Sequence, residues 1–277
     1  MRLMGAPVAV VTEAAAVQEI VEAAASRRGH WTITANLDHL RRYRGDPVAR
    51  GLIDDADLVV ADGMPLVWAS RLAGKPLPER VAGSRLVWSI CKSAAAGGHS
   101  LFLLGGDPGV AERAAGIFTE RYRGLEIAGT ACPPRGFLRD DAQMEDLLSE
   151  LTRVEPQIVF VALGFPKQDL LIRRLRDVLP NASFLGVGIS LSYVTGDVSP
   201  APNWISRLGL EWVYRLSQDP ERLVRRYLID GLPFAVRLMG SATIHRVRYG
   251  RDRDSESWSE DEPLASLAPN ESSGARR

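Results

Sequence analysis

The stretch from residue 157 to residue 169 reads Gln-Ile-Val-Phe-Val-Ala-Leu-Gly-Phe-Pro-Lys-Gln-Asp. Its run of branched and aromatic residues predicts a buried strand, and the Gly-Phe-Pro that follows ends that strand. From Lys167 onward the pattern is helical, with polar side chains in the first turn. A strand that leads directly into a helix is typical of an α/β sheet, so polar groups are expected at the carboxyl end of this strand.

Strand and helix patterns alternate in this way through about the first 190 residues. Short apolar runs predict strands at residues 8–11, 31–35, 58–61, 100–104, 126–130, 158–163 and 183–187. Helical patterns lie between them, at residues 13–26, 37–43, 65–72, 84–95, 108–121, 141–152 and 167–178. Asp107 before Pro108 is expected to cap its helix. The alternation predicts an α/β fold, a mostly parallel sheet with helices on both faces.

The pattern changes after Gly196, where Pro200 and Pro202 interrupt the chain. Three helices and no strand are predicted beyond them, at residues 204–216, 220–230 and 233–245. The end of the chain is rich in Ser, Asp and Glu, which is typical of disorder. We therefore expect an α/β catalytic core over residues 1–198, a basic helical appendage over residues 199–250 and a disordered acidic tail over residues 251–277.

Charge is distributed unevenly along a chain whose formal net charge is zero. Residues 204–251 contain nine Arg and four acidic residues, a net charge of +5, whereas residues 252–277 contain three Arg and seven acidic residues, a net charge of −4. The overall balance argues against a nucleic-acid-binding protein. A basic helical segment that also carries Trp and Leu favours phosphate groups or an anionic membrane surface as partners.

The cysteine content and the apolar runs bear on the cellular setting. Only Cys91 and Cys132 occur, and with no signal peptide they predict a reducing, cytoplasmic environment. No apolar run reaches the roughly 18 residues that suggest a transmembrane helix, so no membrane span is expected.

Polar residues follow two neighbouring predicted strands. Thr34 and Asn36 lie at the end of the strand at residues 31–35, and Asp62 and Gly63 follow the strand at residues 58–61. A carboxylate at this edge of a sheet can take a proton from a substrate hydroxyl, which makes Asp62 a candidate general base. Gly63 allows a tight turn and the close approach of a ligand. Helix capping is the alternative role for Asn36 and for Asp62.

Further candidates lie in the turns and connectors at the same edge. The Gly105-Gly106 turn between a strand and a helix is suited to binding phosphate or ribose through backbone N–H groups. Arg80, in a loop with Pro and Gly, is suited to phosphate, with pairing to Glu79 as the alternative. Gln168 can donate a hydrogen bond to an oxyanion or hold a sugar hydroxyl; the alternative is an ordinary residue in the first turn of a helix.

Metal chemistry has little support in the sequence. The four histidines are scattered, and the Asp55-x-Asp57 pair precedes its strand, at the edge of the sheet opposite to the ligand edge. We therefore expect neither a metal ion nor another cofactor. Without a metal, cationic side chains are needed to stabilise a diphosphate leaving group, and the appendage arginines can supply them.

Seven motifs in one order carry a family resemblance. They are Thr34-x-Asn36, Ala61-Asp-Gly63, Leu77-Pro-Glu-Arg-Val-Ala-Gly83, Leu104-Gly-Gly106, Ala162-Leu-Gly-x-Pro-Lys-Gln168, Gly186-Val-Gly188 and Gly209-Leu-Glu-Trp-x-Tyr-Arg215. With them the chain resembles the WecG/TagA/CpsF glycosyltransferase family (glycosyltransferase family 26) over about residues 5–240. Some of the motifs are weak alone, but their combination and order are specific.

The resemblance implies a Rossmann-like α/β core with a C-terminal helical appendage. It also implies an inverting, metal-independent glycosyltransferase of cell-surface polysaccharide biosynthesis, such as that of teichoic acid or exopolysaccharide. Its donor would be a UDP-sugar, with N-acetylmannosamine or its uronic acid as the sugar, and its acceptor an undecaprenyl-diphosphate-linked sugar. Such an enzyme is peripheral at the cytoplasmic face of the bacterial plasma membrane.

The resemblance also implies roles for individual residues. Asp62 corresponds to the general base of the family, and Thr34, Asn36, Arg80 and Gln168 to other active-site residues. The residues expected to bind substrate are Gly63, Gly105, Gly106, Lys167, Gly188, Arg215, Arg222, Arg225 and Arg226. Three departures from the family pattern are Leu191-Ser192-Tyr193 in place of Phe-Asp-Phe, Pro200 in place of Arg, and Asp169 in place of Glu.

Two other classes of protein compete with this interpretation. A dehydrogenase or methyltransferase would share the sheet type, but no Gly-x-Gly-x-x-Gly follows the first predicted strand. A non-catalytic, membrane-associated nucleotide-binding component of a polysaccharide assembly complex is the second alternative. The donor sugar, the acceptor sugar and the formation of a homo-oligomer stay open.

Overall fold

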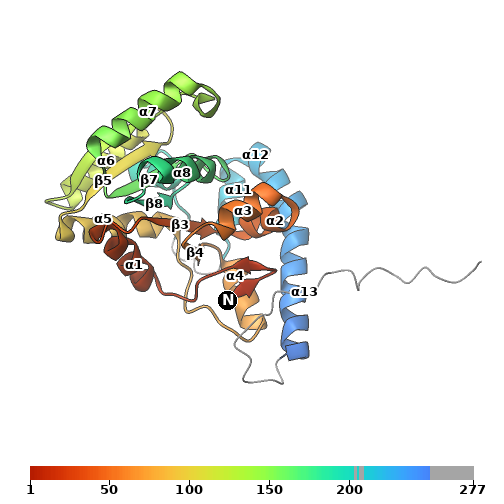
Figure 1. Cartoon of the computed structure of the whole chain (residues 1–277). Coiled ribbons are helices and arrows are strands. Elements are labelled where there is room, and N and C mark those ends of the chain that lie inside the picture. The colour runs from red at the N-terminus through yellow and green to blue at the C-terminus, as the bar shows by residue number, and fades with distance from the viewer. Residues whose placement is uncertain (203–204, 206–208, 250–277) are drawn as a thin grey trace, which may run out of the picture.

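A six-stranded parallel sheet forms the centre of the protein (Figure 1). The computed structural model describes residues 1–202, 205 and 209–249, without the side chains of Arg222 and Tyr249. Along the sheet the strands follow the order β4-β3-β8-β7-β5-β6. They are β3 (His30–Ala35), β4 (Leu58–Ala61), β5 (Ser100–Gly105), β6 (Glu126–Ala131), β7 (Ile158–Ala162) and β8 (Ser183–Gly186). The predicted α/β class and the parallel sheet are confirmed.

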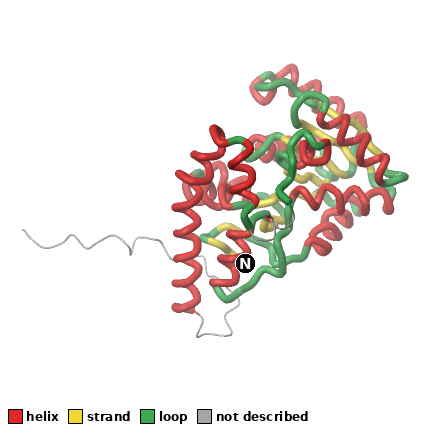
Figure 2. The backbone as a smooth tube through the Cα atoms, turned by 180° about the vertical axis from the view of Figure 1, so that it is seen from behind, coloured by secondary structure: helices red, strands yellow, loops and turns green. Residues whose placement is uncertain are grey.

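Helices cover both faces of the sheet, so that the strands lie between two layers (Figure 2). One layer consists of α1 (Glu13–Ala25), α5 (Gly83–Gly97), α6 (Val110–Arg121) and α9 (Ser190–Thr195). The other consists of α2 (Leu37–Gly45), α3 (Pro47–Asp54), α7 (Asp141–Val154) and α8 (Lys167–Val178). Both layers are buried against alternate residues of the strands, which explains why the strands read as continuous apolar runs.

Strand β5 illustrates this arrangement. Phe102 and Leu104 pack into the cluster under α2, α7 and α8, whereas Leu101 and Leu103 pack into the cluster under α1, α5 and α6. All four side chains are fully buried. Successive residues of a strand point to opposite faces, so one strand contributes to two hydrophobic cores.

Further helical segments follow the sheet, and the last two that the structure describes pack against the second layer. They are α11 (Glu211–Gln218), α12 (Pro220–Val224), the π-helix η2 (Arg225–Gly231) and α13 (Leu232–Tyr249). The long helix α13 lies beside α4 (Met64–Leu72), and η2 lies against α2 (Figure 1). Phe234, Leu238 and Ala242 of α13 are buried in the same cluster as Leu66 of α4. The appendage therefore shares a hydrophobic core with the sheet domain.

Several predicted elements differ in detail from the structure. Residues 8–11 form no strand, and the chain instead begins with a hairpin of β1 (Arg2–Leu3) and β2 (Ala6–Pro7). Residues 8–11 run along the edge strand β4, where Ala9 N–H donates to Val59 O at 2.8 Å. Helices α3 and α9 and the short 3₁₀ turn η1 (Phe137–Arg139) were not among the predicted elements. The start of the helix predicted at residues 204–216 falls partly outside the described residues.

The start of α6 is also corrected. Asp107 is not its N-cap, because the helix begins at Val110 after Gly109. Gly109 has φ +78°, a left-handed conformation that favours glycine and cannot continue an α-helix. The Asp107–Gly109 segment forms a turn in which Val110 N–H donates to Asp107 O at 3.0 Å.

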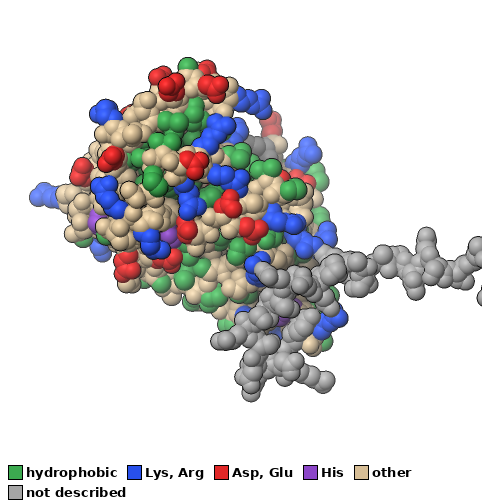
Figure 3. Space-filling model, viewed as in Figure 1, with side chains coloured by type: hydrophobic (Ala, Val, Ile, Leu, Met, Phe, Trp, Pro, Cys, Tyr) green, Lys and Arg blue, Asp and Glu red, His purple; other side chains and the backbone are tan. Residues whose placement is uncertain are grey.

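The surface seen in Figure 3 mixes acidic and basic side chains with apolar patches. In the part of the chain that the structure describes, no helix combines the length and the apolar character needed to cross a membrane.

Candidate functional site

The carboxyl ends of β3 and β4 bring four of the predicted residues together. In the parallel register, Ala35 of β3 lies opposite Ala61 of β4, and Asp62 N–H donates to Ala35 O at 2.7 Å. Asn36 and Asp62 therefore leave neighbouring strands at the same level. A methyl group built on Gly63 would lie 3.7 Å from Asn36 Cβ, and one on Gly83 would lie 3.2 Å from Thr34 Oγ1 and 3.6 Å from Asp62 Oδ2. One small region holds all of these groups.

Asp62 is half-buried at the amino end of α5. Its Oδ2 accepts a hydrogen bond from Gly83 N–H, the first residue of that helix, at 3.1 Å. The capping role considered for Asp62 is wrong for α4, because Gly63 is the N-cap of α4 and no side chain caps it. The Gly83 N–H at the amino end of α5 favours the carboxylate form, and it holds one carboxylate oxygen in a fixed direction.

The pKa of Asp62 is raised to about 6. Burial is the largest cause, and Glu211 raises it further, whereas Arg80, the Gly83 N–H and Arg215 lower it. A carboxyl group with a pKa near 6 is ionised at neutral pH and is a stronger base than an exposed Asp. These are the properties required of a general base that acts near pH 7.

Two arginines lie within electrostatic reach of Asp62. Arg80 pairs with Glu211 rather than Glu79, with Nη1 and Oε2 2.8 Å apart. Arg215 of α11 stacks over the Tyr193 ring at 5.8 Å from its centroid. Two guanidinium groups near Asp62, one of them paired with Glu211, can stabilise negative charge that develops on a leaving group.

Thr34 and Asn36 both serve the local structure. Thr34 Oγ1 donates to Gly186 O of β8 at 3.3 Å. Asn36 is the N-cap of α2, and its Oδ1 accepts from Asp38 N–H at 3.0 Å and from His39 N–H at 3.4 Å. The capping alternative is therefore confirmed for Asn36. Capping uses the amide oxygen, whereas the amide nitrogen has no hydrogen bond within the described part of the chain, so Nδ2 is the group that can meet a substrate.

Gln168 lies beneath the backbone where β7 and β8 end. Its side chain is buried, and Oε1 accepts from Gly164 N–H at 3.1 Å and from Gly188 N–H at 3.0 Å. Its Nε2 occupies the space where a Cβ on Gly186 would lie, 2.3 Å from the ideal position. These contacts favour a role in fixing the two glycine turns over a direct contact with a sugar.

The other core residues predicted to bind substrate are either bonded within the sheet or exposed to solvent. Gly105 and Gly106 have φ values of +95° and +87°, and Gly106 N–H already donates to Ala162 O at 2.8 Å. That N–H is therefore used within the sheet and is not oriented toward a phosphate. Lys167 is an exposed first residue of α8. The described residues give it no hydrogen bond or ion pair with the other predicted site residues.

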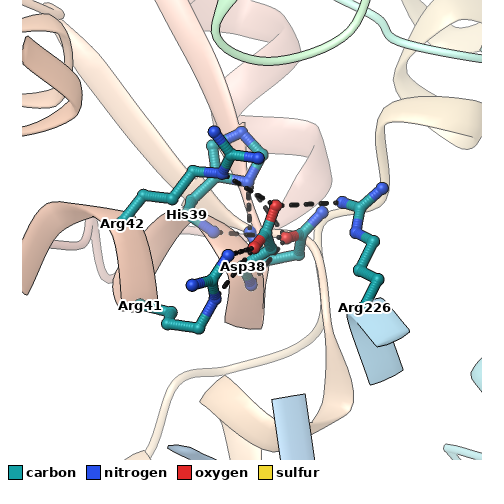
Figure 4. Close-up of polar contacts among 6 residues, drawn as sticks. Asp38, His39, Arg41, Arg42 and Arg226 are labelled. Atoms are coloured by element: carbon teal, nitrogen blue, oxygen red, sulfur yellow. Dashed lines mark hydrogen bonds and ion pairs between the residues drawn. The ribbon is translucent and has the colours of Figure 1, made fainter. Parts of the chain in front are cut away.

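The appendage arginines differ in their placement. Arg226 of η2 approaches Asp38 at 3.5 Å, and the same carboxylate binds Arg41 at 2.9 Å and Arg42 at 3.2 Å (Figure 4). These arginines hold the pKa of Asp38 below its usual range even though burial acts to raise it. Arg225 is exposed, and the side chain of Arg222 lies outside the described residues. Three arginines therefore surround one carboxylate, that of Asp38, which lies two residues after Asn36 in the chain.

A cavity of about 330 Å³ lies between the segment after α9 and the helices α11 and α12. Its volume falls within the range of about 300–1,000 Å³ that is usual for small-molecule pockets. It is lined by Ile189, Asp197, Val198, Ser199, Arg215, Gln218, Asp219 and Leu223. Because Arg215 also lies near Asp62, the cavity adjoins the cluster at the sheet edge.

Asp55 and Asp57 lie away from this site, as the sequence predicts. Asp55 pairs with Arg173 at 2.7 Å, and Asp57 pairs with Arg176 at 3.2 Å and accepts from Trp31 N–H at 2.8 Å. Among the residues that the structure describes, no three His, Cys, Asp or Glu side chains form a group that could hold a metal ion.

Glu211, Asp38 and His39 were not identified from the sequence. Glu211 stands in the Gly-Leu-Glu-Trp motif as one of few acids in a basic segment, a signal that marks it for attention but names no partner. His39 is buried, with Nδ1 3.0 Å from Asn36 Oδ1 and its ring 4.3 Å from that of Phe165. The contact with Phe165 joins residues from separate elements, and sequence spacing does not predict it.

Comparison with known proteins gives two matches. The model of the family described as "Glycosyl transferase WecG/TagA/CpsF family" matches residues 1–248. The chain is also similar to an N-acetylglucosaminyldiphosphoundecaprenol N-acetyl-beta-D-mannosaminyltransferase from Bacillus spizizenii. The two are 32% identical over 209 residues, which cover 76% of this chain and 79% of the relative.

Proposed function

The chain belongs to the WecG/TagA/CpsF family of glycosyltransferases, and on this basis we propose that it transfers N-acetylmannosamine, or its uronic acid, from UDP to an undecaprenyl-diphosphate-linked acceptor sugar. The relative's name supports the donor sugar and N-acetylglucosamine as the acceptor sugar. Family membership also favours an enzyme over the non-catalytic assembly component.

The observation that carries the proposal is the position of Asp62 beside Arg80 and Arg215 at the carboxyl edge of the sheet. Asp62 takes the proton of the acceptor hydroxyl as the hydroxyl oxygen forms a bond to the anomeric carbon of the donor. The bond from that carbon to the β-phosphate oxygen breaks, and the phosphate oxygen keeps the electron pair. Attack from the face opposite UDP inverts the anomeric centre.

Arg80 and Arg215 would stabilise the diphosphate as negative charge develops on it. Their guanidinium groups can bind phosphate oxygens in a bidentate manner, which suits a leaving group of this shape. With these cations in place the reaction requires no metal ion, so we propose a metal-independent transfer. The cavity beside Arg215 provides space for a part of one substrate.

The appendage provides a surface suited to a lipid-linked acceptor. Ile229, Leu232 and Val236 are 63%, 52% and 66% exposed along η2 and α13, and Arg225 and Arg237 on the same elements are also exposed. Apolar side chains accompanied by cations favour the interface of an anionic membrane. We therefore propose that the enzyme binds the membrane as a peripheral protein, at the inner face that the family resemblance implies.

Release of UDP from a panel of UDP-sugars tests the proposal. The panel contains UDP-N-acetylmannosamine, its uronic acid, UDP-N-acetylglucosamine and UDP-glucose, with undecaprenyl-diphosphate-linked N-acetylglucosamine and EDTA present. We expect acceptor-dependent release from UDP-N-acetylmannosamine or its uronic acid. Release only after Mg²⁺ or Mn²⁺ is restored would contradict the metal-independent mechanism, and release from another donor would contradict the donor assignment.

A further inference from the structure

Glu211 joins the appendage to the carboxyl edge of the sheet, where Asp62 lies (below, the catalytic edge). It is the first residue of α11, and its partner Arg80 lies in the connector between α4 and α5. The Nη1–Oε2 distance is 2.8 Å, and the Arg80 and Glu211 side chains are only 19% and 27% exposed. The pair spans 131 residues of sequence. A second ion pair that crosses from the core to the appendage is Asp38–Arg226.

Glu211 lies in a cluster of alternating charges around Asp62. Arg80 and Arg215 lower the pKa of Asp62, and Glu211 raises it, so all three are close enough for their charges to act on this carboxyl group. Arg215 follows Glu211 by four residues, which places both side chains on one face of α11. The cluster contains two carboxylates and two guanidinium groups. Removal of Glu211 would leave Arg80 without its partner at the site where UDP is proposed to leave.

The connector that carries Arg80 explains why this side chain needs a partner. Arg80 follows Pro78 and precedes Gly83, outside any helix or strand, and a long Arg side chain loses much rotamer freedom when it is fixed. A bond to Glu211 fixes the guanidinium before substrate binds. A cation held in place stabilises a developing charge better than one that must be ordered during the reaction.

We propose that Glu211 is a positioning residue that holds the Arg80 guanidinium at the catalytic edge. When α11 docks on the core, the same contact aligns Arg80. This inference rests on the proposed function and deepens it. Glu211 acts through Arg80 and does not itself touch the reacting atoms.

A double-mutant cycle in the full-length chain tests the inference. Glu211→Gln keeps the size of the side chain and removes its charge, and we expect kcat/KM to fall about tenfold, mainly in kcat, for the loss of one charge-assisted hydrogen bond. In an Arg80→Gln background the same substitution should have almost no effect, because the residue through which Glu211 acts is gone. Glu221→Gln, an exposed Glu of the same appendage, is the matched control and should leave kcat/KM unchanged.

An equal effect of Glu211→Gln in both backgrounds would overturn the inference, since Glu211 would then act independently of Arg80. Urea unfolding of the same four proteins separates positioning from docking. A loss of activity that follows the loss of stability in every variant would show that the ion pair only holds α11 in place, and this too would overturn the inference.

The binding of UDP alone distinguishes failure of this inference from failure of the proposed function. If the wild-type chain shows no acceptor-dependent release, the proposed function fails, and calorimetric titration with UDP still tests the pair. Glu211→Gln should weaken UDP binding several-fold when Arg80 is present and leave it unchanged in the Arg80→Gln background. Weakening of similar size in both backgrounds would overturn the inference regardless of the reaction catalysed.

Discussion

Two aspartates follow different strands of the same sheet, and burial raises the pKa of both. Asp62 follows β4, and its pKa is about 6. Asp169 lies in the first turn of α8, after β7, and its pKa is about 7. Asp62 is half-buried beside two arginines and the amino end of a helix, whereas Asp169 is fully buried near Trp31 and Gln168. The carboxylate oxygens of Asp169 lack hydrogen bonds of normal geometry. Gln168 and Trp31 lower the pKa of Asp169 by less than burial raises it.

The comparison shows that a raised pKa does not by itself identify a catalytic group. Asp62 has access to a substrate and cations to stabilise a leaving group, whereas Asp169 has neither. We therefore assign catalysis to Asp62 and a role in the core to Asp169. The predictions below test this division, beginning with the largest expected effect.

Asp62→Asn should lower turnover by about 10²–10⁴, the usual contribution of a general base. The amide keeps the shape of the side chain but cannot accept a proton, so UDP affinity should change little. Acceptor-dependent UDP release and calorimetric UDP binding measure the two quantities. Asp169→Asn is the matched control, with less than a tenfold change in turnover, and a greater loss in that control than in Asp62→Asn would reverse the assignment.

Arg215→Gln should lower kcat/KM by about 10²-fold, a loss comparable to that of one donor in a preorganised anion site. The guanidinium near Asp62 would be lost without the removal of a large apolar surface. Steady-state kinetics check this, with the exposed Arg174→Gln on α8 as the control. Equal effects of the two substitutions would remove Arg215 from the site.

Asp169→Asn should change the pH dependence of stability rather than activity. Because the folded pKa of Asp169 is above the unfolded value of 3.8, wild-type stability falls as pH rises from about 4 through about 7 and levels off above. The variant cannot ionise, so its stability relative to wild type should improve by about 1–4 kcal/mol between pH 4 and pH 8. Urea unfolding at the two pH values measures the difference, and a constant difference would contradict the pKa of Asp169.

Thr34→Val should have the smallest effect, a decrease in kcat/KM of about fivefold. The substitution removes one neutral hydrogen bond to Gly186 O, typically worth about 1 kcal/mol. Thr119→Val, an exposed Thr that bonds only within its own helix, is the control. A loss beyond 10²-fold would show that Thr34 touches the reacting groups directly.

Much of the fold could be predicted from the sequence, because strong apolar runs predict strands well. Six of the seven predicted strands are present, and the predicted helix at residues 167–178 is matched by α8. The strand predicted at residues 8–11 is wrong, because an apolar run beside an edge strand can form a single hydrogen bond to it without forming a ladder. The start of α6 was wrong because the left-handed Gly109 decides it rather than Asp107.

The candidate site was predicted as a set of residues, but their partners were not. Parallel strands bring Thr34, Asn36 and Asp62 to one edge, which the strand ends alone indicate. The Arg80–Glu211 pair and the position of Gln168 beneath Gly186 depend on the packing of separate elements. The π-helix η2, which directs Arg226 toward Asp38, also has no simple pattern in the sequence.

The pH dependence of kcat/KM, with UDP-N-acetylmannosamine and the lipid-linked acceptor, tests the central claim most directly. Because Asp62 must be ionised to accept a proton, the rate should rise with pH, with an apparent pKa near 6, and level off above it. The residual activity of Asp62→Asn should lack this rise, and Asp169→Asn should retain it. A rise that persists in Asp62→Asn and disappears in Asp169→Asn would contradict the account.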